Sequence, residues 1–148
     1  AKTILLVEAA IKCDPRTDPE VPKEVHDRAK EAVSSHSMSM GLETKHMLPD
    51  SHYQMMTVYM GRMDAAWVYP QNIIQWSDDL QKRDPMGSID KVDFFVMMNN
   101  STMMLRGLGD MLRQPRNLAE VWAPFARRAL EEEGLLEEVE REIASWRQ

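Results

Sequence analysis

Two glycines in the stretch MLRGLGDM, residues 104–111, stand where a phosphate-binding loop could begin. A dinucleotide-binding loop needs a preceding strand and a glycine at the third fingerprint position, where the backbone approaches the pyrophosphate. That position is Leu112 here, and the preceding residues have a helical pattern. A Walker-type loop needs Gly-Lys-Ser or Gly-Lys-Thr, and neither tripeptide occurs in the chain. We therefore interpret Gly107 and Gly109 as the site of a close helix contact or a bend.

A second stretch offers ligands for a soft metal ion. The segment HSMSMGLETKHM, residues 36–47, contains His36, Met38, Met40, His46 and Met47. Imidazole and thioether groups suit Cu(I). The chain contains 13 methionines, however, and Met fills helical cores much as Leu does, so such a cluster also arises without a metal. We expect no metal site and no other cofactor, and keep a copper-handling helical protein as a weaker alternative.

Nucleophilic catalysis would have to combine Cys13, a serine or a threonine with one of the four histidines. These histidines all lie in the first third of the chain, at His26, His36, His46 and His52. None belongs to a motif that places a nucleophile and an orienting acid beside it. We expect the histidines to face solvent and the protein to have no catalytic residue.

The charge and the single cysteine narrow the class of protein. The formal net charge is −6, and residues 131–148 contain seven Glu against two Arg. No basic stripe with interleaved aromatic residues is present, so we expect no nucleic-acid binding. Cys13 alone cannot form an internal disulfide or a multi-cysteine zinc site. The apolar runs are too short for a membrane-spanning helix, so any membrane contact is expected to be peripheral or through a partner.

The spacing of apolar residues predicts helices throughout and no strand. Helices are expected at residues 3–13, from Pro22 to a cap at Gly41, at 51–63 after an N-cap at Asp50, after Pro70, from a cap at Ser88 to about residue 112, and from Asn117 onward. Pro124 should kink or divide the helix that contains it. In the tail, Leu136, Val139, Ile143 and Trp146 predict an amphipathic helix with an acidic outer face.

We therefore expect an all-α fold, a single compact domain of about six or seven helices. Its main body would comprise residues 1–130, and residues 131–148 would form the acidic C-terminal helix. At 148 residues one hydrophobic core is expected.

Three segments resemble the C-terminal helical region of the ABC1 family, the UbiB or ADCK-type atypical kinases. They are MGLETK (residues 40–45), MLRGLGDML (104–112) and NLAEVWAPFARRAL (117–130). The last segment matches the family pattern Trp-x-Pro-x-Ala-x-x-Ala-Leu at Trp122, Pro124, Ala126, Ala129 and Leu130. The resemblance implies part of a kinase-like C-lobe, in which Gly107 and Gly109 allow a neighbouring helix to approach.

The same resemblance implies that the chain is not an enzyme. The family's ATP-handling elements lie upstream of this region and none is present in these 148 residues, so no residue inherits a catalytic role. Instead we expect packing or interaction roles for Arg106, Gly107, Gly109, Trp122, Pro124, Phe125 and Trp146. A buried Trp122 would cost about 3 to 5 kcal/mol when replaced by Ala.

We expect a non-catalytic structural or interaction subunit, bound to other protein subunits of a larger assembly. Similar proteins act around quinone and prenyl-lipid metabolism in plastids and mitochondria, which implies an accessory component of a photosynthetic or respiratory membrane complex, with a plastid favoured over a mitochondrion. The alternative is the C-terminal part of a longer ABC1-type ATP-dependent kinase or ATPase. Either way, helices that normally pack on a larger lobe expose apolar surface when that lobe is absent.

Overall fold

The computed structural model describes residues 1–63, 68–89, 92–113 and 115–147, and only the backbone of residues 88, 89, 92–96, 98 and 99. Along these ranges the chain forms seven helices and two short strands. In chain order they are α1 (Lys2–Lys12), α2 (Lys23–Ser39), β1 (Leu42–Thr44), α3 (Pro49–Met60), α4 (Ile73–Arg83), β2 (Met86–Ile89), α5 (Val92–Met111), α6 (Leu118–Glu132) and α7 (Leu136–Ser145). The predicted all-α fold is confirmed.

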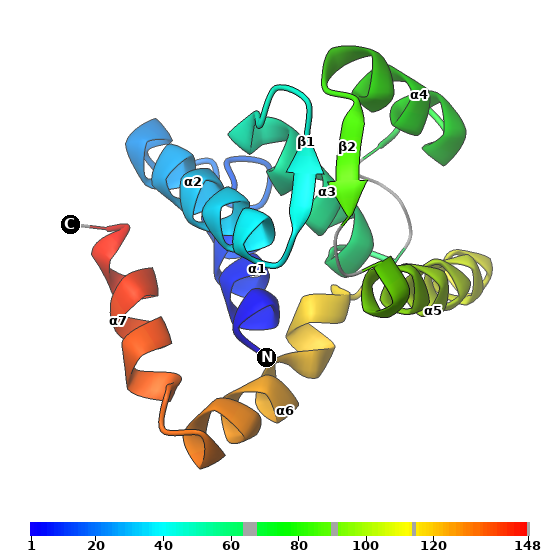
Figure 1. Cartoon of the computed structure of the whole chain (residues 1–148). Helices are drawn as coiled ribbons and strands as arrows, with labels where there is room; N and C mark the ends of the chain where they lie inside the picture. The colour runs from blue at the N-terminus through cyan, green and yellow to red at the C-terminus, as the bar shows by residue number, and fades with distance from the viewer. Residues whose placement is uncertain (64–67, 90–91, 114, 148) are drawn as a thin grey trace.

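Helix α1 is the centre of the molecule (Figure 1). It packs against α2 and α3 on one side and against α6 and α7 on the other. Such a helix must be apolar around most of its surface, and Leu5, Leu6, Val7, Ala10 and Ile11 are all buried. Elements from both halves of the chain therefore share one central helix.

The core has two parts that meet at α1. The larger part joins α1, α2 and α3, with Tyr53, Met55 and Met56 of α3 almost completely buried. The smaller part lies between Leu5, Val139 and one face of α6. On that face the contact is made mainly by small residues, Ala119, Ala123 and Ala126, so α6 can approach α1 closely.

The absence of strands was a wrong prediction. β1 and β2 pair antiparallel, with Leu42 opposite Ile89 and Thr44 opposite Met86. Strands of three and four residues are too short to show an alternating pattern in the sequence. Ser88 consequently belongs to β2 and does not cap α5, whose first residue is Val92.

Other helix boundaries differ in detail from the sequence predictions. Gly41 is confirmed at the end of α2, with a φ of 89°. α3 begins at Pro49, so Asp50 lies inside the first turn, because proline is well suited to the first helical position. Pro124 does not divide α6, which continues through it as one curved helix (Figure 1). The capping box formed by Asn72 and Gln75 at the start of α4 was missed.

The acidic tail helix is packed against the body of the protein. Trp146 is 3% exposed and belongs to the larger part of the core, while Val139 belongs to the smaller part. An ion pair of 2.7 Å joins Lys2 of α1 to Glu142 of α7. The predicted amphipathic helix is confirmed, and its apolar side contributes to the same core as α1.

Candidate functional site

A chain of hydrogen bonds connects four buried polar side chains from α2, α3, β1 and the end of α4. Ser34 Oγ lies 2.7 Å from His52 Nδ1, and Thr44 Oγ1 lies 3.3 Å from His52 Nε2. The Thr44 hydroxyl donates to Asp84 Oδ2 at 2.7 Å. Because that hydroxyl proton is used for Asp84, the Thr44 oxygen can only accept from His52 Nε2–H. Burial lowers the pKa of His52 and favours the neutral ring, in which Nδ1 accepts from the Ser34 hydroxyl.

Asp84 is the end of this chain and also an anchor for the backbone. Its carboxylate accepts from the backbone N–H of His46 at 2.7 Å and of Leu48 at 3.1 Å. Burial would raise the pKa of Asp84, but the hydrogen bonds from Thr44, His46 and Leu48 outweigh it and hold the pKa below the ordinary value of 3.8. The ionised Asp84 carboxylate thus fixes the backbone between β1 and α3.

A serine, a histidine and an acid in this order resemble a catalytic triad, in which they are the nucleophile, the base and the group that orients the base. Here Thr44 lies between the histidine and the acid. The four side chains are, however, between 0% and 4% exposed, so a substrate cannot reach Ser34. We conclude that this group stabilises the fold. The prediction that the histidines face solvent was wrong for His52, because its partners lie 18 residues before it and 8 residues before it and no local motif marks them.

We expect the free energy of unfolding to decrease as the pH falls below about 6.5, in part through His52. Burial lowers the pKa of His52 from its ordinary value of 6.5, although the Asp84 carboxylate acts in the opposite direction. Below pH 6.5 the unfolded state therefore binds more protons than the folded state, so stability is complete above this pH and is lost below it. Urea unfolding between pH 7 and 5 should show a smaller decrease for His52→Gln than for the original protein; equal slopes would contradict this role.

The outward side of α5 is apolar. Met97 is 71% exposed, Met104 78%, Leu108 54% and Met111 82%. With about 100° between successive helical residues, these four side chains lie within an arc of roughly 60°. We call them the methionine face.

The inward side of α5 has the opposite character. Thr102 and Arg106 are buried there, and Gly109 lies on the same side one turn further on. A helix of a globular protein ordinarily turns its apolar side to the core and its polar side to solvent. The described second half of α5 therefore has its polarity reversed.

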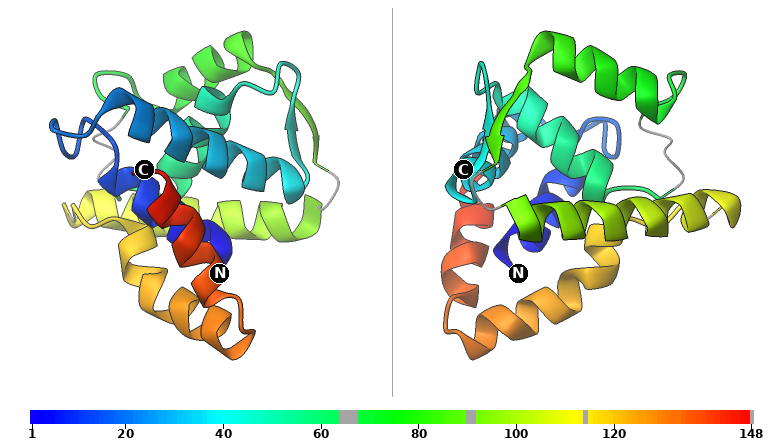
Figure 2. Two further views of the ribbon diagram at one scale, coloured as in Figure 1. Left: turned by 90° about the vertical axis from the view of Figure 1, so that its left-hand side faces the viewer. Right: turned by 45° about the vertical axis from the view of Figure 1, so that its right-hand side comes forward.

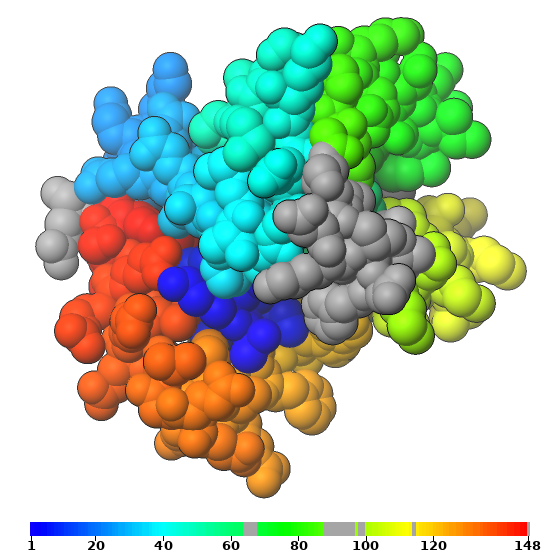
Figure 3. Space-filling view, in the orientation of Figure 1, coloured from blue at the N-terminus to red at the C-terminus, as the bar shows by residue number. Residues whose placement is uncertain are grey.

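The position of α5 leaves the methionine face accessible. α5 packs chiefly against α3 and extends along one edge of the molecule (Figure 2). In the space-filling view its described residues form the margin opposite the acidic helix α7 (Figure 3). The methionine face of α5 thus lies far from the negative charge of the glutamate-rich helix α7.

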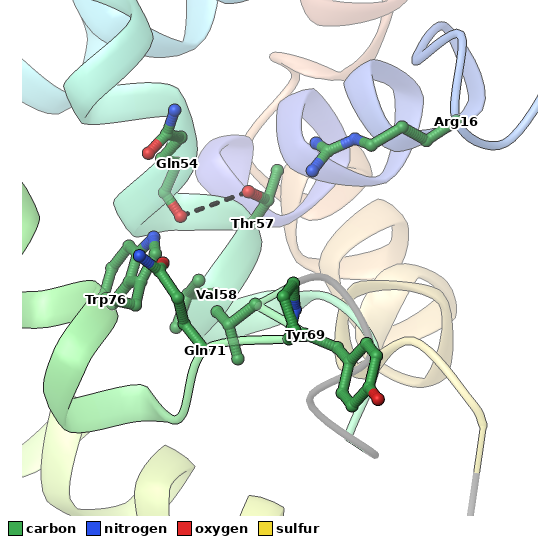
Figure 4. Close-up of a pocket in the computed structure, with 9 residues that line it drawn as sticks. Arg16, Gln54, Thr57, Val58, Tyr69, Gln71 and Trp76 are labelled. Carbon is green, nitrogen blue, oxygen red and sulfur yellow. Dashed lines mark hydrogen bonds between the residues drawn. The ribbon is translucent and has the colours of Figure 1, made fainter.

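A small cavity of about 200 Å³ lies between the α1–α2 loop, α3 and the start of α4. Of the described residues that line it, Arg16 is the one charged side chain, and its guanidinium points toward Thr57, whereas the ring of Tyr69 points away (Figure 4). Arg16 forms an ion pair of 2.6 Å with the buried Asp14. Burial would raise the pKa of Asp14, but hydrogen bonds from Arg16 and Tyr53 lower it to about 2. Because the Asp14 carboxylate neutralises the Arg16 guanidinium, the described lining of the cavity has no unbalanced charge with which to bind an ionic ligand.

The two glycines of the RGLG segment have different surroundings. A Cβ atom at Gly109 would lie 2.5 Å from Met63 Cβ and 2.9 Å from Met63 Sδ, so the expected close contact exists here. Gly109 contacts the turn after α3 and not a neighbouring helix. In this turn the Met63 N–H donates to the backbone carbonyl of Arg116 at 3.1 Å. A Cβ atom at Gly107 would meet nothing within 4 Å, so the close approach predicted for Gly107 does not occur among the residues that the structure describes.

These surroundings predict opposite effects for two matched substitutions. Gly109→Ala should lower the free energy of unfolding by about 1 to 3 kcal/mol, because the added methyl group overpacks the contact with Met63. Gly107→Ala should raise it by up to about 1 kcal/mol, because Ala favours the helix and has free space here. Urea unfolding of the two variants checks both signs, and equal effects would show that α5 does not pack as described.

The other predicted packing residues are divided between core and surface. Arg106 and Trp146 are buried, and Trp122 is only partly buried. Pro124 is exposed and Phe125 is 74% exposed, so neither contributes to the core. The α6 residues that do pack are two leucines and three alanines, and the sequence analysis gave none of them a packing role: Leu118, Ala119, Ala123, Ala126 and Leu130.

The residues considered for copper are not gathered into one group. His36 Nε2 and Met40 Sδ both contact Thr3 Oγ1, at 3.1 Å and 3.2 Å, whereas His46 and Met47 are exposed in the segment after β1. Within the described ranges, no three or more His, Cys, Asp and Glu side chains are placed to hold a metal ion.

Comparison with protein-family models, with curated proteins and with solved structures finds no match. The resemblance to the ABC1 family therefore rests on the three sequence segments alone. No helix in the described part of the chain is long and apolar enough to cross a membrane.

Proposed function

We propose that this chain is a non-catalytic protein-interaction domain that binds its partner through the methionine face of α5. The observation that carries the proposal is the reversed polarity of this helix, with Thr102 and Arg106 inward and Met97, Met104 and Met111 outward. Exposed apolar surface of this kind is typical of interaction sites. Methionine is also well suited to such a surface, because its flexible, polarisable side chain adapts to a partner.

The charge of the surface favours a protein partner over other macromolecules. The four side chains of the methionine face are uncharged, and the net charge of the chain is −6. A helix that binds anionic lipids carries Lys or Arg beside its apolar side, and a nucleic-acid interface needs a basic patch. An apolar, uncharged surface on another protein is the complementary partner.

The cellular role follows from the sequence resemblance and is part of the same proposal. Such a domain would act as an accessory subunit of an organellar membrane complex, held at the membrane through its protein partners. If the chain is instead the C-terminal part of a longer ABC1-type kinase, the methionine face would pack against the catalytic lobes of the same polypeptide. In both cases the face is buried in the working assembly.

Site-specific photocrosslinking tests the use of this surface. A benzoylphenylalanine at position 104 should give crosslinked protein adducts in the organism or extract from which the chain comes. Position 74 is the matched control, because Ile74 is 76% exposed on α4 and Met104 is 78% exposed on α5. Adducts at both positions or at neither would contradict the proposal, whereas adducts at 104 alone would support it.

A further inference from the structure

We propose that the methionine face binds the same face of a second copy of this chain, with the two α5 helices antiparallel and a twofold axis passing beside Met104. This inference depends on the proposed function, because it names the partner of the same surface. It rests on the symmetric spacing of the three methionines about Met104, on the free space at Gly107 and on the distribution of charge.

The three methionines of the face are spaced symmetrically about Met104, whereas its fourth member, Leu108, has the exposed Asn100 as its counterpart. Met97 lies seven residues before Met104 and Met111 lies seven residues after it. Seven residues are about two helical turns, so the three side chains are nearly aligned along the helix. A twofold axis at Met104 therefore places Met97 of one copy opposite Met111 of the other, and the two Met104 side chains opposite each other. Such mutual correspondence is what a twofold interface requires.

Gly107 gives a second reason for a helix partner at this position. It lies on the exposed side of α5, one turn from both Met104 and Met111, and a Cβ atom there would meet nothing within 4 Å. Glycine weakens an exposed helix, and among the described residues no contact at Gly107 compensates for this. Under the proposed symmetry the exposed Ser101 of the second copy lies at the same height as Gly107. Small residues on both sides of Met104 would let the two backbones approach.

The charged side chains that the structure describes on α5 do not oppose this pairing. No charged side chain belongs to the methionine face, and the exposed Asp110 lies roughly 130° around the helix from the centre of the face. The glutamate-rich helix α7 is on the opposite side of the molecule (Figure 1), so two paired copies keep their acidic helices apart.

The size of the face sets the expected strength. α5 has 20 residues and is about 30 Å long, so one side of it covers much less than the roughly 800 Å² per partner of a standard interface. The dimer is therefore weak and concentration-dependent, with a dissociation constant in the micromolar range or above.

Sedimentation equilibrium from low micromolar to several hundred micromolar protein tests the association. The average mass should rise from 17.1 kDa toward twice that value. Met104→Lys should remain a monomer with unchanged thermal unfolding, because Lys and Met have similar helix propensities and the side chain is exposed in the monomer. Ile74→Lys, an equally exposed site on α4, should dimerise like the original chain. A monomer at every concentration, or equal dimerisation by both variants, would overturn the inference.

Cysteine crosslinking tests the antiparallel arrangement. In a Cys13→Ala background, a mixture of Met97→Cys and Met111→Cys proteins should form a mixed disulfide dimer, whereas each protein alone should form little. Met104→Cys alone should form a dimer across the axis. Dimers of Met97→Cys with itself and of Met111→Cys with itself would indicate parallel helices and overturn the inference. Circular dichroism of each variant confirms that it is folded.

The two proposals fail in different ways. If photocrosslinking at position 104 captures a different protein while the chain sediments as a monomer, the interaction surface is supported and its self-pairing is overturned. If neither position 104 nor position 74 gives adducts and the chain is monomeric, both proposals fail.

Discussion

Replacing Asp84 with Ala will lower the free energy of unfolding by roughly 3 to 6 kcal/mol, because a buried donor left without an acceptor costs about 1 to 3 kcal/mol. Three donors depend on this carboxylate: the Thr44 hydroxyl and the backbone N–H groups of His46 and Leu48. The side chain is 1% exposed, so water cannot easily replace it. The loss would be a large part of the total stability of a domain of this size.

Urea unfolding of three variants measures this effect. Asp84→Asn keeps one carbonyl acceptor and should be less harmful than Asp84→Ala. Asp78→Ala removes an exposed carboxylate from α4, whose side chain is 65% exposed, and should change the stability by less than about 0.5 kcal/mol. If Asp84→Ala cost less than about 1 kcal/mol, the hydrogen bonds between β1, α3 and the end of α4 could not have the role assigned to them.

The second large effect is expected for Trp146→Ala, which should cost about 3 to 5 kcal/mol. Trp146 is 3% exposed and belongs to the larger part of the core, so its removal would leave a cavity in that part of the core. The sequence reading assigned a loss of this size to Trp122, whose partial burial now predicts a smaller one.

Phe125→Ala is the matched control for an aromatic residue. Phe125 is 74% exposed, so its replacement should change the stability by less than about 0.5 kcal/mol. Thermal or urea unfolding of the two variants gives the comparison. A similar loss for Phe125→Ala and Trp146→Ala would show that α6 and α7 do not pack on the core as described.

Helix positions were predictable because a helix repeats its apolar contacts every three or four residues. The spacing of Leu136, Val139, Ile143 and Trp146 is sufficient to place α7 and its buried side. The end of α2 was predictable from Gly41 for an equally local reason, because the residue there has a positive φ, which favours glycine. These two features, each determined within a few residues of the chain, were therefore predictable from the sequence.

Apart from the local capping box of Asn72 and Gln75, the missed features depend on residues far apart in the sequence. Thr44 and Asp84 are separated by 40 residues, and neither has neighbours that mark it as part of a hydrogen-bonded chain. β1 and β2 are likewise stabilised by each other and show no pattern of their own. Pairing between distant segments can be inferred only when the fold brings them together.

The methionine face is an intermediate case. The spacing of Met97, Met104 and Met111 is visible in the sequence, but apolar residues occur on several sides of α5. Periodicity shows that such residues share one side and does not tell which side faces the core. The inward side is identified only by the burial of Thr102 and Arg106 and by the contact of Gly109 with Met63.

The accessibility of this face also makes its chemistry different from that of the core. Met55, Met56 and Met60 are at most 2% exposed, whereas Met97, Met104 and Met111 are at least 71% exposed. Peroxide would therefore oxidise the thioethers of α5 to sulfoxides first, and each sulfoxide makes an apolar side chain polar. Mild oxidative stress would therefore make the methionine face polar, while the buried methionines of α3 stayed reduced.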